Sequence, residues 1–315
     1  MTVITHTVTL KSARHFGRRV PPDALAKLLG MLPRAVRQSI RMAIEGRSTA
    51  RGRKPVWLDA ASDIRFVGHS GEDDTVLCFE APPLGEAAEV LYGQTQLWPT
   101  KPDPGDTGFD LLGDVVKEVA AGNQDSERFD SGLLRRIGNF GRGLNGAFQT
   151  MAFAGHRYSE SEPAVVDHAI IQTAQELFTS TPRAQRARIV GNLDMIRAST
   201  QAFALKLENG QEVRGVLVEG GIEQLAQFFQ KRVLVLGKSV FRPSGRLLRI
   251  DAHEVSLAGQ ESTIWSRLPT PGSGRLEAGL LRKPQGPKSG AAAIIGRWPG
   301  EETDEDIRKT LEEIS

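Results

Sequence analysis

The chain has 315 residues, of which 39% are hydrophobic and 25% are charged. This mixture supports buried cores and excludes a chain that is disordered throughout. No run of about eighteen apolar residues is present, so a transmembrane helix is excluded, and we expect neither a signal peptide nor membrane binding. The single cysteine, Cys78, excludes an internal disulfide and a cysteine-rich zinc site, and it favours a reducing, cytoplasmic location.

The net charge of +2 hides two oppositely charged blocks. Residues 1–60 hold twelve Lys/Arg and three Asp/Glu, a net of +9, and residues 61–130 hold four Lys/Arg and fifteen Asp/Glu, a net of −11. Blocks of this kind either bind outside partners or neutralise each other within the fold. We expect the second, because sequence neighbours usually lie close together in space.

Helix and strand patterns alternate through the N-terminal part. Residues 1–10 alternate as in a strand, and two short helices are predicted between Asp23 and Gly46, with a break at Gly30 and Pro33 in the first turn of the second helix. The further predicted elements are strands at 64–67 and 75–79 and helices at 84–91, 109–121, 128–140 and 163–178.

The second predicted helix carries a basic flank formed by Arg34, Arg37 and Arg41. Two short helices joined by a turn can form a DNA-binding helix-turn-helix, in which these arginines would bind nucleic acid. The same pattern is typical of an ordinary helical hairpin, so nucleic-acid binding is the alternative here.

A second unit with strand patterns begins near residue 188. Its predicted elements are strands at 189–196, 202–207, 212–218, 232–236, 238–241 and 247–250 and a helix at 222–229. An Asn209-Gly210 turn is the strongest short hairpin signal. Together they predict a small antiparallel β-barrel.

Two features of the barrel sequence bear on nucleotides. Gly237-Lys238-Ser239 lacks the preceding glycine of a phosphate-binding loop, because Arg232 stands at that position, and it is predicted to be a hairpin turn. Small barrels can bind single-stranded nucleic acid through a basic groove with exposed rings. The barrel has basic residues, but we expect Phe228, Phe229 and Phe241 to fill its core.

The sequence shows no pattern typical of catalysis. The six histidines stand outside any known catalytic signature, and Cys78 lies in an apolar strand, where cysteines are usually inert. In Asp167-His168 and His253-Glu254, adjacent residues need not share a face. We therefore expect no catalytic residues, no metal site and no cofactor, and a protein that is not an enzyme.

The C-terminal segments differ from the rest. Residues 268–293 are rich in Pro and Gly, which predicts a disordered linker. Residues 294–315 contain Trp298-Pro299-Gly300 and then a predicted helix of about twelve residues with apolar Ile307, Leu311 and Ile314 on one stripe. So short a helix is not stable alone. It needs a groove, either on a partner or on its own protein.

The segment from 296 to 315 resembles the C-terminal tails of small bacterial antitoxins that neutralise PIN-domain ribonuclease toxins. Those tails often carry a Trp-Pro-Gly turn and then an acidic amphipathic helix. The resemblance covers about 20 of 315 residues, and the rest departs from the short DNA-binding end of typical antitoxins. It implies that the chain binds and inhibits a PIN-type toxin through Arg297, Trp298, Ile307, Leu311 and Ile314. Arg297, or Arg282 and Lys283, would face the acidic Mg²⁺ site of the toxin.

The sequence therefore predicts an α+β protein with four segments: a mixed domain over 1–187, a small antiparallel β-barrel over 188–267, a linker over 268–293 and a partner-binding tail over 294–315. The leading function is an antitoxin-like interaction protein. The alternative is a nucleic-acid-binding regulator that uses the basic N-terminal helices or the barrel.

Overall fold

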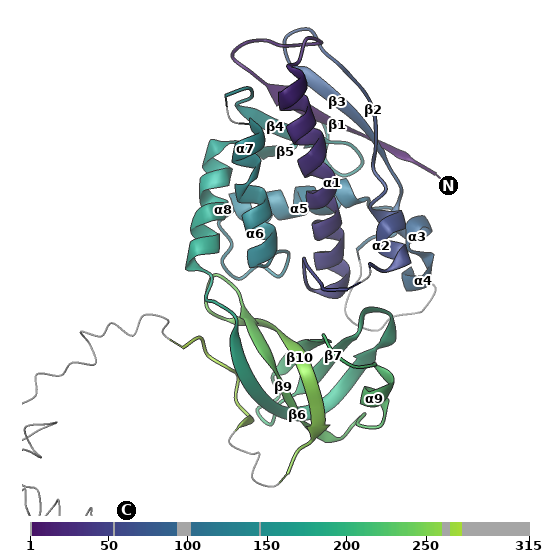
Figure 1. Ribbon diagram of the computed structural model, residues 1–315, viewed down its shortest axis with the longest axis vertical. Coiled ribbons are helices and arrows are strands. Elements are labelled where there is room, and N and C mark those ends of the chain that lie inside the picture. Colours follow the sequence, from purple (N-terminus) through teal and green to yellow (C-terminus); the bar gives the residue numbers. More distant parts are fainter. Residues whose placement is uncertain (1, 53, 93–101, 145, 260–264, 273–315) are drawn as a thin grey trace, which may run out of the picture. The chain divides into compact units, whose positions relative to one another are not determined.

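The computed structural model describes residues 2–52, 54–92, 102–144, 146–259 and 265–272. The described chain combines helices, a five-stranded sheet and a closed five-stranded barrel, which confirms the predicted α+β class (Figure 1). The predicted tail residues Arg297, Trp298, Ile307, Leu311 and Ile314, and most of the predicted linker, lie outside the described residues.

The first part is built on an antiparallel sheet with strand order β2-β3-β1-β4-β5. The central strand β1 (Ile4–Lys11) pairs with β3 (Thr75–Ala81) and β4 (Thr150–Ala154), while β2 (Arg65–Ser70) and β5 (Ala164–Val166) form the edges. The alternation predicted from the sequence places Val8 and Leu10 in the core.

Eight helices of the described chain belong to this first part. They are α1 (Pro22–Glu45), α2 (Val56–Ala61), α3 (Leu84–Ala87), α4 (Glu89–Tyr92), α5 (Gly108–Ala120), α6 (Ser131–Gly138), α7 (Phe140–Leu144) and α8 (His168–Ser180). The helix α1 contacts α5, α6 and α7, and α6 contacts α8 (Figure 1). The prediction of one helix over 163–178 was partly wrong, because β5 occupies the first residues of that range.

The prediction of two helices between Asp23 and Gly46 was wrong, because α1 is one helix of 24 residues. Leu28, Leu32 and Val36 form a continuous, fully buried face across the expected break. Tertiary packing of this face outweighs the weak helix propensity of glycine and the hydrogen bond that Pro33 cannot donate. The turn that a helix-turn-helix requires is therefore missing from this described segment.

The second part is the closed barrel, with strand order β10-β8-β7-β6-β9. Its elements are β6 (Gln185–Arg197), the 3₁₀ turn η1 (Ala198–Thr200), β7 (Ala202–Lys206), β8 (Glu212–Leu217), α9 (Glu223–Ala226), β9 (Arg232–Phe241) and β10 (Leu247–Leu257). The pairs are antiparallel except β8 with β10. The long first strand pairs with the second and the fourth, and a helix separates the third from the fourth. This connectivity is that of an OB-fold.

The prediction of a hairpin turn at Gly237-Lys238-Ser239 was wrong, because β9 runs through it without interruption. Lys238 pairs with Arg186 on one side and with Asp251 on the other. A Cβ at Gly237 would collide with the backbone of Asp251, so glycine here allows the close approach of β10.

The expectation that three phenylalanines fill the barrel core holds in part. Phe241 is buried and Phe228 packs against the barrel core, whereas Phe229 is 46% exposed. Leu248 of β10 instead belongs to the core of the first part, so the two cores meet at this strand. None of the described helices is long and apolar enough to cross a membrane.

Two glycines of the α1 region allow a test of the single helix. A Cβ would meet no atom at Gly30, inside α1, or at Gly46, its C-cap, but Gly46 has a left-handed φ of 71°. We expect Gly30→Ala to raise the free energy of unfolding by about 0.5–1 kcal/mol, and the matched Gly46→Ala to lower it by about 1 kcal/mol. Denaturant unfolding measures both, and a loss of stability in Gly30→Ala would contradict a continuous helix.

Candidate functional site

The main cavity of the described chain lies between the first part and the barrel and has a volume of about 890 Å³. Apolar side chains from both parts form much of its wall: Met42, Leu111, Val115, Phe203, Val216 and Leu248. Five arginines also line it: Arg128, Arg157, Arg197, Arg214 and Arg249. Six acidic residues line it as well, so its wall mixes apolar groups with charges of both signs: Glu45, Asp103, Asp106, Asp114, Glu127 and Glu212. A cavity of this volume lies within the range of ligand sites.

Three aspartates approach this cavity from the start of α5. Asp106, Asp110 and Asp114 are spaced by four residues, which places them on one side of the chain as it enters and follows the helix. Asp110 forms a capping box, because its Oδ2 accepts hydrogen bonds from Thr107 N at 2.8 Å and from Thr107 Oγ1 at 2.9 Å. The start of α5 therefore fixes the position of Asp110.

The loop after β4 brings a second set of polar groups to these aspartates. Arg157 forms ion pairs with Asp106 (Nη1 to Oδ2, 3.2 Å) and with Asp114 (Nη2 to Oδ1, 3.0 Å). Tyr158 Oη donates to Asp114 Oδ1 at 2.5 Å. The backbone N–H of Arg157 donates to Asp110 Oδ1 at 3.0 Å, so all three aspartates hold this loop.

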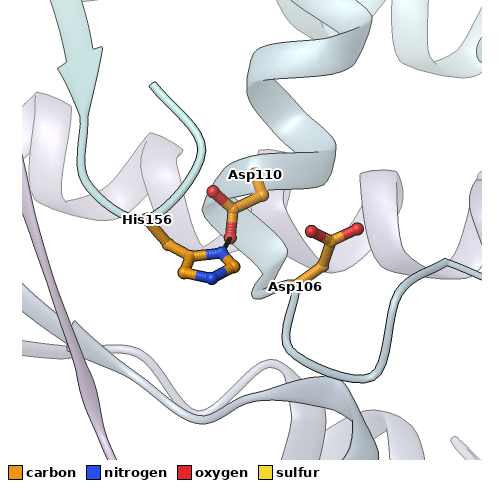
Figure 2. A group of neighbouring side chains, drawn as sticks. All are labelled: Asp106, Asp110 and His156. Atoms are coloured by element: carbon orange, nitrogen blue, oxygen red, sulfur yellow. Dashed lines mark ion pairs between the residues drawn. The ribbon is translucent and has the colours of Figure 1, made fainter. Parts of the chain in front are cut away.

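Asp106, Asp110 and His156 form the group that most resembles a metal site (Figure 2). One ligand atom from each lies within 4.8 Å of the others, and His156 Nδ1 is 3.6 Å from Asp110 Oδ2. Two carboxylates and an imidazole suit a divalent transition metal. However, Asp110 would have to leave its capping box to bind a metal through Oδ2. The contacts of this group that the structure shows are therefore those of the capping box and of the loop after β4.

Burial shifts the pKa values of this cluster. Burial, together with the charges of Asp110, Asp103 and Asp114, raises the pKa of Asp106 despite the nearby Arg157. Burial also raises the pKa of Tyr158, and its hydrogen bond to Asp114 acts in the same direction. The pKa of His6 is lowered by burial, although Asp110 opposes this shift. Asp106 is thus an aspartate whose charge the folded state disfavours.

A separate buried ion pair joins the two parts. Arg249 of β10 donates through Nη1 to Asp130 Oδ2 at 3.2 Å and to Gly46 O at 3.0 Å. Asp130 is the N-cap of α6 and also accepts hydrogen bonds from Ser48. Burial alone would raise the pKa of Asp130, but Arg249 and these hydrogen bonds outweigh it and hold the pKa below its usual value.

The expected neutralisation of residues 1–60 by residues 61–130 was wrong. Among the described residues, the ion pairs of the N-terminal bases stay within 41–59. The acidic block pairs instead within itself, with Arg157 and with arginines of the barrel: Arg214, Arg242, Arg246 and Arg249. The acids of the first part are thus the charge partners of the barrel.

The three arginines predicted to bind nucleic acid do not form one exposed surface. Arg34 is exposed, whereas Arg37 donates through Nε to Ser62 Oγ at 3.0 Å. Arg41 is buried and pairs with Glu45, and burial lowers its pKa. The five predicted tail residues lie outside the described residues.

The other features noted in the sequence have structural explanations. Asp167 caps α8 by accepting a hydrogen bond from Ile170 N at 2.9 Å. A Cβ at Gly143 would press against Leu28 and Met31, so this glycine allows α7 to approach α1. Sequence reasoning missed the cluster around Asp114, although the four-residue spacing of its aspartates was a usable signal. Comparisons with protein-family models, curated proteins and solved structures found no match to this chain.

The two buried aspartates should respond to neutralisation in opposite ways. At pH 7, Asp130→Asn should lower the free energy of unfolding by about 3 kcal/mol, because Arg249 stays buried without its partner carboxylate. The loss should shrink as pH falls through the depressed pKa of Asp130, since the wild type then also becomes neutral.

Asp106→Asn should leave stability unchanged or raise it at pH 7, because it removes a charge that the fold disfavours. This advantage should fade as pH falls from the raised pKa toward the unfolded value of about 3.9. Denaturant unfolding of both variants at several pH values tests the pair. Equal destabilisation of the two variants at pH 7 would contradict the opposite pKa shifts of Asp130 and Asp106.

Proposed function

We propose that this chain is an antitoxin-like, non-enzymatic interaction protein of a toxin–antitoxin system, which binds and inhibits a PIN-type ribonuclease through its tail. The tail sequence carries the proposal, because a Trp298-Pro299-Gly300 turn precedes an acidic segment with apolar residues at Ile307, Leu311 and Ile314. This spacing is typical of a helix that binds in a groove, and tryptophan is a common interface anchor.

The resemblance of the tail also suggests how inhibition works. A PIN-type ribonuclease has an acidic, Mg²⁺-binding active site, and Arg297 stands directly before the anchoring Trp298. A guanidinium pairs well with carboxylates, so Arg297 would occupy the acids that otherwise hold the metal. Arg282 and Lys283 are the other bases close enough in sequence for this role.

The polar groups of the described body support a non-enzymatic role. The carboxylate of Asp110 is held by a capping box, that of Asp167 caps α8, and Asp114 accepts bonds from Arg157 and Tyr158. Each of these contacts holds a helix or a loop in place.

The tail proposal is tested by placing a charge on the apolar stripe. We expect Leu311→Asp to abolish co-purification with a PIN-type ribonuclease encoded next to this chain, while the Tm of the free protein stays unchanged. Burial of a leucine is worth about 1.5–3 kcal/mol, so the affinity should fall at least about tenfold.

The matched control is Lys309→Gln, which makes the same change of −1 in net charge on the opposite side of the predicted helix. It should retain the ribonuclease. If Leu311→Asp lowers the Tm and the protein still captures its partner, the tail binds its own body and the proposal fails.

A second candidate is a nucleic-acid-binding regulator. The connectivity of the barrel favours it, because strands 2 and 3 of OB-folds and the loops beside them bind oligonucleotides in many proteins. Fold alone does not determine function. The barrel, rather than α1, carries this candidate, since Arg41 is buried beside Glu45.

A further inference from the structure

Three arginines of the barrel converge on one loop of the first part. Arg214 stands on β8, and Arg242 and Arg246 flank the turn between β9 and β10. We name residues 122–128, which connect α5 to α6, the acidic loop. Its carboxylates, Asp125 and Glu127, are the groups that these arginines contact.

The contacts are short and of the charge-assisted type. Glu127 accepts from Arg214 Nη1 at 2.7 Å and from Arg242 Nη2 at 2.7 Å. Asp125 accepts from Ser244 Oγ at 2.6 Å, and its Oδ2 lies 3.5 Å from Arg246 Nη1. The barrel thus directs three guanidinium groups and a hydroxyl at two carboxylates, the donor set that also suits phosphate oxygens.

Three arginines face two carboxylates, and among the described residues no acceptor receives a hydrogen bond from the buried Nε of Arg242. The side chain of Glu127 is 48% exposed, and that of Asp125 is 47% exposed. Solvent-exposed ion pairs of this kind contribute little stability, so an anionic ligand can displace them.

The same surface continues into the main cavity. Arg214 and Glu127 line this cavity, and so do Arg197 and Arg249. The half-buried Met195 also lines this cavity and can contact a base. A cavity of about 890 Å³ has room for a nucleotide or two but not for the width of a duplex.

We propose that this surface of the barrel, formed by Arg214, Arg242 and Arg246, is a binding site for single-stranded nucleic acid that the acidic loop covers. The backbone phosphates take the places of the Asp125 and Glu127 carboxylates, and the bases enter the cavity. The inference rests on the second candidate function. It adds the binding site on the barrel and names the acidic loop as the group that competes with nucleic acid for this site.

Neutralising the acidic loop in the full chain tests this. Asp125→Asn/Glu127→Gln should bind a labelled oligothymidylate of about 12 nucleotides, which fits one OB-fold, about tenfold more tightly than the wild type at low salt. The control Glu160→Gln/Glu162→Gln makes the same change of net charge at exposed residues elsewhere, and it should gain much less. The Tm of each variant shows that the fold is retained.

Removal of the arginines provides the second arm. Adding Arg214→Gln and Arg246→Gln to the acidic-loop variant should cancel the gain. Because binding to a single strand releases about 0.7 counterion per phosphate contact, the slope of log affinity against log salt should lose about 0.7 for each arginine. A duplex of the same sequence should bind more weakly than the single strand.

The outcomes separate the site from the function. Three results would overturn the proposed site and leave a nucleic-acid role elsewhere on the chain. They are equal gains in affinity in the control and in the acidic-loop variant, tighter binding of the duplex than of the single strand, and oligonucleotide binding that does not change when the arginines are replaced. If no variant binds the oligonucleotide, the second candidate function fails together with the site. The tail proposal is independent of both results.

Discussion

The buried ion pair between Arg249 and Asp130 is the interaction on which the described architecture depends. Burying two charges is unfavourable unless hydrogen bonds satisfy them, and here Ser48, the first turn of α6, Asp251 and the carbonyl of Gly46 supply those bonds. One contact thereby joins β10 of the barrel to the end of α1 and the start of α6. Neighbouring Leu248 adds apolar packing against the first core.

The position of this pair explains the charge pattern of the chain. Once Arg249 is fixed on Asp130, Arg214 and Arg242 of the barrel lie beside the acids that precede Asp130 in sequence, and both pair with Glu127. The cavity and the acidic loop are therefore consequences of one interface. The interface holds arginines of the barrel against an acidic segment of the first part.

The sequence predicts those helices and strands that local residue patterns determine. Alternation in β1 and the Asn209-Gly210 turn indicated strands that are present, and Thr107 with Asp110 carries the signature of a helix start. The continuity of α1 through Gly30 depends on burial against other elements, which no local signal records. The prediction of the ion-pair partners of the acidic block was wrong for the same reason, because Asp130 and Arg249 are 119 residues apart in the sequence. The cavity needs the two parts together and could not be predicted from either.

Calorimetric unfolding of the full chain carrying Arg249→Met tests the central role of this ion pair most directly. The wild type should unfold in one main transition whose calorimetric and van't Hoff enthalpies agree, because the interface couples the two cores. The variant leaves Asp130 buried without its arginine, so the barrel and the first part should separate into two transitions. A variant that keeps one transition with an unchanged Tm would contradict the account.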